Sequence, residues 1–87
     1  MSASERITAA LTEAFRPTEL QVIDESDRHK GHAGARPGGE THFRIVIAAA
    51  AFQGVGRVEI HRRINQALAA EFSAGLHALA IVARGTP

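Results

Sequence analysis

The sequence predicts one α+β domain, a two-layer sandwich in which helices cover one face of a three-stranded mixed sheet. Its 87 residues are enough for only one hydrophobic core. Apolar residues recur with helical spacing in two segments, at the N-terminus and after residue 56. Three shorter segments have strand character, which gives the order α-β-β-α-β and a two-layer architecture.

The first helix is expected over residues 3–15. Ser2 and Glu5 have the spacing of a capping box, with Ser2 as the N-cap. The residues of one helical face are apolar: Ile7, Leu11, Ala14 and Phe15. Pro17 then ends the helix.

Two strands should follow, over residues 20–24 and from His42 onward. Leu20 and Val22 share a face of the first, and the second alternates apolar with other residues: Phe43, Ile45 and Ile47. We expect these two strands to pair antiparallel. Residues 48–56 are ambiguous, because the alanine run fits either a longer strand or a helical turn that the glycines then end.

A long helix is predicted from Arg57 to about Ala74, with Gly75 as the residue after its end. Its buried face should hold Ile60, Ile64, Ala67, Leu68 and Phe72. The last strand is expected over residues 77–83. Because a helix connects it to the strand that begins at His42, those two strands should be parallel, with a right-handed crossover.

The composition excludes several functional classes. With no cysteine, the chain can form no disulfide and no metal site from its own thiolates, which fits a cytoplasmic protein. The apolar run Ile45–Phe52 is too short to cross a membrane, and no signal peptide is evident. A net charge of +1 does not by itself indicate a nucleic-acid partner. No nucleophile or nucleotide motif indicates independent catalysis.

Residues 27–41 are expected to form a flexible loop between the first two strands. The segment 27–42 holds three of the five histidines, His29, His32 and His42, and four of the eight glycines. It is much longer than the usual hairpin connection, so it is either a solvated loop or a binding loop. An intrinsic zinc site would need three or four ligands, and the histidine spacing matches no strong zinc motif.

His77 opens the last predicted strand and shares parity with Leu79 and Ile81. Its side chain should therefore lie at the rim of the buried face. It is either a hydrogen-bonded histidine at a strand end or a ligand, and the residue alone does not decide between them. The acidic residues 24–27 are expected to be a solvated strand end rather than an acid–base pair.

Several motifs together resemble the BolA family, in the family's order and over about residues 5–83. They are Asp24-Glu25-Ser26 followed by His29, Gly39-Glu40-Thr41-His42-Phe43, Phe52-x-Gly54, His61-Arg62, Leu68-x-x-Glu71 and His77-Ala78-Leu79. The family's order is α-β-β-α-α-β, similar to class II KH domains. This resemblance favours a helical turn within residues 48–56.

The resemblance implies a non-enzymatic partner of a monothiol glutaredoxin, acting in iron–sulfur cluster assembly, trafficking or iron sensing. The two proteins would share a [2Fe–2S] cluster, with glutaredoxin and glutathione supplying thiolates. His77 would be one ligand and His29 the other, with His32 as a rival, whereas His42 is expected to be structural. The isolated chain should hold no cofactor and be a monomer or weak homodimer.

The resemblance also implies an alternative, a DNA-binding transcriptional regulator. Four residues give the start and middle of the long helix a basic character: Arg57, His61, Arg62 and Arg63. The glycines before this helix suggest a KH-like loop, although Gly54-Val55-Gly56 is not the Gly-x-x-Gly of a KH clamp. The other reading of these residues is a solvated helix face.

Overall fold

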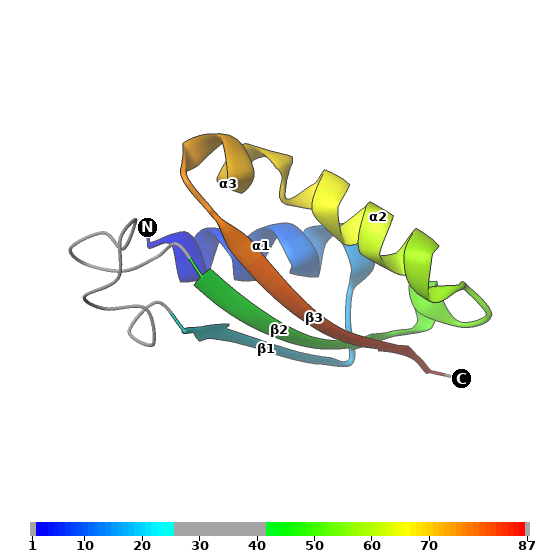
Figure 1. The fold of residues 1–87 in the computed structure, drawn as a ribbon. Helices are drawn as coiled ribbons and strands as arrows, with labels where there is room; N and C mark the ends of the chain where they lie inside the picture. The colour runs from blue at the N-terminus through cyan, green and yellow to red at the C-terminus, as the bar shows by residue number, and fades with distance from the viewer. Residues whose placement is uncertain (1, 26–41, 87) are drawn as a thin grey trace.

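The structure is a computed structural model that describes residues 2–25 and 42–86. Its elements, in chain order, are α1 (Ala3–Phe15), β1 (Glu19–Asp24), β2 (His42–Ala49), the 3-10 helix η2 (Ala50–Phe52), α2 (Arg57–Ala67), α3 (Ala69–Ala74) and β3 (Ala78–Gly85). Figure 1 shows the helices on one side of the sheet, as the sequence predicts. The expectations for the loop 27–41, with His29 and His32, lie outside the described residues.

The sheet has the order β1-β2-β3, with β1 antiparallel and β3 parallel to the central strand β2. Both predicted pairings are confirmed. Alternate residues of β2 face the helices and are almost completely buried: Phe43, Ile45, Ile47 and Ala49. β2 has a neighbouring strand on each side, so it lies at the centre of the sheet and its buried face contributes to the core. The two ends of β2 therefore lie at the two ends of the sheet.

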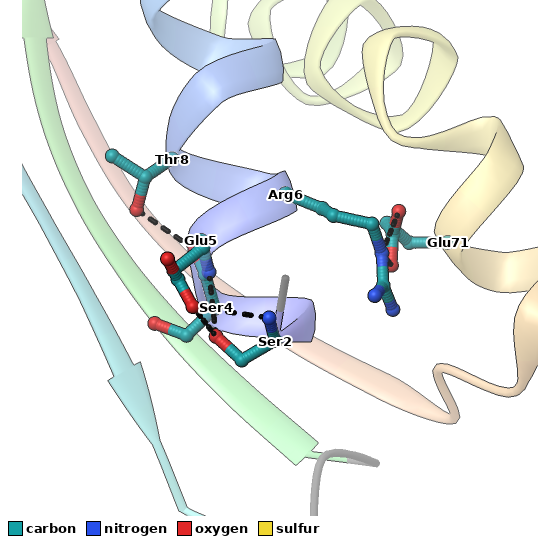
Figure 2. Close-up of polar contacts among 6 residues, drawn as sticks. All are labelled: Ser2, Ser4, Glu5, Arg6, Thr8 and Glu71. Carbon is teal, nitrogen blue, oxygen red and sulfur yellow. Dashed lines mark hydrogen bonds and ion pairs between the residues drawn. The ribbon is translucent and has the colours of Figure 1, made fainter.

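Helix α1 has the predicted bounds and the predicted capping box (Figure 2). The Glu5 N–H donates to Ser2 Oγ at 3.1 Å, and the Ser2 N–H donates to Glu5 Oε1 at 3.1 Å. Its buried face is formed by Ala3, Ile7 and Leu11. The helix ends at Arg16, whose φ of 46° is left-handed, directly before Pro17.

The ambiguous segment after β2 contains both predicted structures. The strand continues to Ala49, and η2 then turns the chain toward α2. Phe52 holds this turn in place, since it is buried at 1% exposure and its ring centroid lies 4.8 Å from that of Phe15. Gly54 follows with a φ of 74°, a conformation that favours glycine.

The predicted helix over residues 57–74 is in fact two helices, divided at Leu68. Leu68 has φ −104° and ψ 15° and is 1% exposed, so its side chain is in the core although its backbone leaves the helical conformation. Because the chain changes direction at Leu68, α3 does not continue the axis of α2. Phe72, which was predicted to be buried, is 37% exposed. Leu76 is buried beyond α3 instead.

An ion pair connects α3 to α1. Arg6 Nε lies 3.1 Å from each carboxylate oxygen of Glu71, whose side chain is only 13% exposed (Figure 2). Glu71 also accepts a backbone hydrogen bond from Leu76 at 2.9 Å. The pair therefore fixes α3 directly before the segment that leads to β3.

Candidate functional site

The turn after α3 determines where His77 lies. Gly75 has a φ of 127°, and its N–H donates to the Phe72 carbonyl at 3.3 Å, while the Leu76 N–H donates to the Glu71 carbonyl at 2.9 Å. These two bonds form a Schellman motif with glycine at the left-handed position. The motif directs Leu76 into the core, and His77 follows it on the surface.

The predicted environment of His77 is therefore wrong. β3 begins one residue later, at Ala78, and His77 is exposed rather than at the rim of the buried face. The strand alternation that places Leu79 and Ile81 toward the helices does not extend back to His77, because Leu76 already occupies the buried position. His77 is thus an accessible side chain at the end of the sheet.

His42 lies beside His77. Their ring centroids are 6.0 Å apart, with an angle of 65° between the ring planes. The parallel register pairs His42 with Ala78, so the first residue of β2 and the residue before β3 meet at one end of the sheet. The parallel crossover predicted from the sequence already implies this proximity, but the sequence analysis assigned His42 a structural role.

Glu25, the residue after β1, takes part in the strand pairing at this end. The Glu25 N–H donates to the His42 carbonyl at 2.8 Å, and Arg44 Nε lies 3.1 Å from Glu25 Oε2. The Glu25 side chain is 16% exposed. The Glu25 carboxylate therefore neutralises Arg44 and is mostly buried, which differs from the solvated strand end expected for residues 24–27; residues 26 and 27 lie outside the described residues.

The separation of the two imidazoles is slightly larger than one tetrahedral metal ion requires. A metal about 2 Å from an imidazole nitrogen lies about 3 Å from the ring centroid, so two rings on one tetrahedral ion have centroids about 5 Å apart. The centroids of His42 and His77 are 6.0 Å apart, so both rings could bind one ion only after a small side-chain rotation. Among residues 2–25 and 42–86, no three or more histidine, cysteine or acidic side chains are grouped to hold a metal ion. His42 and His77 could thus supply two ligands, and the others would have to come from elsewhere.

A different kind of site lies at the other end of the sheet, where β2 and β3 finish. A groove of about 290 Å³ lies between η2, the start of α2 and the end of β3. Its polar lining comes from Gln53, Arg57, His61 and Arg84. The N-cap residue of α2, Gly56, provides no side-chain hydrogen bond to the first turn. Two of the four predicted nucleic-acid residues, Arg57 and His61, line this groove.

The other two predicted basic residues are bound to a carboxylate. Arg62 Nη2 lies 2.7 Å from Glu59 Oε2, and Arg63 Nε lies 2.9 Å from the same oxygen. Hydrogen bonds from both guanidinium groups lower the pKa of Glu59 to about 2, and Glu59 in turn raises the pKa of Arg62. The positive charge of this helix face is therefore partly neutralised at neutral pH.

No helix in the described part of the chain is both long and apolar enough to cross a membrane.

Comparison with solved structures gives a close match to the BolA domain of SufE1 from Arabidopsis thaliana. The TM-score is 0.86 at 44% identity, with 98% of this chain and 93% of that chain covered.

Sequence relatives agree with this match. The chain is 50% identical to a Sinorhizobium protein named "Uncharacterized protein in cobS 5'region", over 93% of this chain and 88% of the relative. It is 42% identical to the "DNA-binding transcriptional regulator BolA" of Escherichia coli, over 93% and 73% of the two chains. It is 40% identical to the chloroplastic protein BOLA1 of Arabidopsis thaliana, of which it spans 51%. The family model for BolA-like proteins matches residues 11–87, and the chain therefore belongs to the BolA-like protein family.

Proposed function

We propose that this protein is a non-enzymatic cytoplasmic partner of a monothiol glutaredoxin, with which it co-ligates a [2Fe–2S] cluster for cluster assembly, trafficking or iron sensing. One observation carries the proposal: His77 is exposed at the end of the sheet, beside His42, in a chain without cysteine. An accessible imidazole can be shared with a second protein, whereas a buried one cannot.

The available donors fit one half of such a cluster. Two histidines replace two cysteines on one iron in Rieske centres, and the imidazole ligands raise the reduction potential. His77 follows the Schellman turn and directly precedes β3, so its backbone is well fixed. Protonation of an imidazole near neutral pH removes it as a ligand, which favours a transferable cluster over a permanent one.

The second ligand remains a choice among three histidines. His29 has the family position after Asp24-Glu25-Ser26, and His32 is its neighbour in the sequence; both lie outside the described residues. His42 joins them because its ring centroid lies 6.0 Å from that of His77. We retain His29 as the first choice, since His42 is only half-exposed at the start of β2.

The proposal is tested by mixing the protein with a cluster-loaded monothiol glutaredoxin and following visible absorption and circular dichroism. His77→Ala should abolish the spectrum of the mixed complex. His61→Ala is the matched control, because His61 lies in the groove at the opposite end of the sheet, and it should leave the spectrum unchanged. Single alanine variants of His29, His32 and His42 then identify the second ligand.

An unchanged spectrum with His77→Ala would remove His77 from the ligand set. If the unaltered chain produced no new spectrum and no binding to glutaredoxin, the partnership itself would be wrong. Amide spectra of each variant must show a folded domain, so that a lost spectrum reports ligation rather than unfolding.

A second candidate is a DNA-binding regulator, favoured by 42% identity to the Escherichia coli protein of that name and by the groove at the start of α2. Backbone N–H groups at a helix N-terminus attract phosphate, and Arg57 adds positive charge there. Glu59 opposes this attraction, because it lies in the first turn and binds Arg62 and Arg63.

DNA binding is tested by fluorescence anisotropy over a range of salt concentrations. Phosphate contacts predict an affinity that falls steeply with salt. Arg57→Glu should then weaken binding, while Arg57→Lys should retain most of it. Equal affinity for the three proteins would exclude Arg57 from any DNA interface.

A further inference from the structure

The two edge strands of the sheet differ in how well they are protected against pairing. β1 has an acidic residue at each end, Glu19 and Asp24, and Pro17 precedes it. β3 has no charged residue and no proline from Ala78 to Ala83, and Arg84 is its first charge. Proteins usually protect an exposed edge with charges, proline or a bulge, because its free backbone groups can pair with another strand. β3 lacks these features over six residues.

The hydrogen-bonding pattern identifies which backbone groups of β3 point outward. The Thr86 N–H donates to the Ala49 carbonyl of β2 at 3.3 Å, so the even-numbered residues of β3 bond to β2 in this parallel register. The N–H and C=O groups of Leu79, Ile81 and Ala83 therefore point away from the sheet. In residues 2–25 and 42–86, no residue outside β3 forms a backbone hydrogen bond with these N–H and C=O groups.

Side-chain burial also shows that this edge is open. Leu79, Ile81 and Ala83 face the helices, but they are only half-buried, whereas the corresponding residues of β2 are fully buried. On the other face, Val82 is 52% exposed. A strand added next to β3 would give these four side chains cross-strand neighbours on both faces of the sheet.

We propose that β3 pairs antiparallel with β3 of a second copy of this chain, which joins the two sheets across a two-fold axis. With Val82 opposite Val82 of the other copy, Ile81 forms hydrogen-bonded pairs with Ala83 of the other copy. Arg84 then lies opposite Ala80, so no like charges face each other. The two-fold pairing uses the β3 edge of both copies, so the assembly closes as a dimer.

The dimer should be weak. The two central hydrogen-bonded pairs supply about four inter-strand hydrogen bonds. One strand pair buries much less than a standard interface of about 1,600 Å². We therefore expect monomers at low concentration and dimers only at high micromolar to millimolar concentration.

The absence of cysteine permits a direct test by disulfide cross-linking. In the proposed register the two Val82 residues are a non-hydrogen-bonded pair with Cα atoms about 4.5 Å apart, a separation that allows a disulfide. Under mild oxidation, Val82→Cys should form covalent dimers at least tenfold faster than Ile23→Cys. Ile23 is a suitable control because it lies on the same face of the sheet and is 40% exposed, but belongs to β1.

A second test uses sedimentation equilibrium of the unaltered chain and of Ala83→Pro. The proline removes an outward N–H without removing a bond to β2, so the variant should stay folded and become monomeric. Equal cross-linking rates for the two cysteine variants would overturn the proposal. So would a natural chain that is monomeric at millimolar concentration, or a dimer that Ala83→Pro leaves intact.

Discussion

The two ends of the sheet carry different chemistry, although the same strands form both. At the end where β2 and β3 begin, His42 and His77 lie side by side with His77 exposed. At the end where these strands finish, Arg57, His61 and Arg84 surround a groove. Eight residues of strand separate the two ends by roughly 25 Å.

This contrast shows how one small fold can present two separate surfaces. The histidine end has imidazole nitrogen donors, a ligand type that suits a transition metal. The groove end has positive charge, but Glu59 binds two of the nearby arginines and Arg84 lies 3.7 Å from Glu19 Oε1. The histidine end is therefore the proposed site for a cluster, and nucleic-acid binding at the groove end is the second candidate.

The largest expected effect comes from a residue that supports both ends. Ile64 is completely buried in the single core, so Ile64→Ala should lower the free energy of unfolding by about 2–5 kcal/mol. Urea unfolding would measure the loss. Val58→Ala on the same helix is the control, because Val58 is 84% exposed and should change stability by less than about 0.5 kcal/mol. A similar loss for both variants would contradict the assigned core.

A smaller effect should perturb only the groove end. A Cβ atom on Gly85 would lie 2.7 Å from the Gln53 Cα, so Gly85→Ala must displace the backbone and should cost about 1–3 kcal/mol. Gly56→Ala is the matched control, since nothing lies within 4 Å of its Cβ position. Amide NMR shifts should change around His61 and not around His77. Changes of equal size at both histidines would show that the ends are not independent.

The smallest expected effect is the pH dependence of the Glu59 cluster. Because Arg62 and Arg63 lower the folded-state pKa of Glu59 to about 2 from an ordinary value of 4.5, the pairing stabilises the fold above about pH 4.5 and is lost as the pH falls toward 2. Solvent exposure keeps the stabilisation small. Carboxyl NMR shifts should give a depressed midpoint that rises in 1 M salt and in Arg62→Ala. A midpoint near 4.5 in the unaltered protein would contradict the pairing.

Local sequence signals predicted most of the fold. The capping box of Ser2 and Glu5 and the stop at Pro17 predicted α1. Strand alternation predicted β1 and β2, and the helical connection predicted the parallel pairing of β2 with β3. The division at Leu68 was missed because neither glycine nor proline marks it. Leu68 and Leu76 are buried on either side of α3, and tertiary packing of this kind overrides helical periodicity.

The site was predicted less completely. His77 was selected from the sequence, but its exposure was not, because a Schellman turn followed by a buried leucine interrupts the strand alternation. His42 was assigned a structural role although the predicted parallel pairing of β2 with β3 already places the start of β2 next to His77. The strand order and direction were predictable, but the distance between the two rings depends on the exact register, which local sequence signals do not give.

The most direct test of the central claim is an NMR titration of the histidine side chains with a cluster-loaded monothiol glutaredoxin. If His77 binds the cluster, the signals of His77 and its neighbour His42 should shift or broaden, while those of His61 stay unchanged. Unchanged His77 signals, together with shifts confined to His61, would place the partner at the groove end and contradict the proposed histidine site.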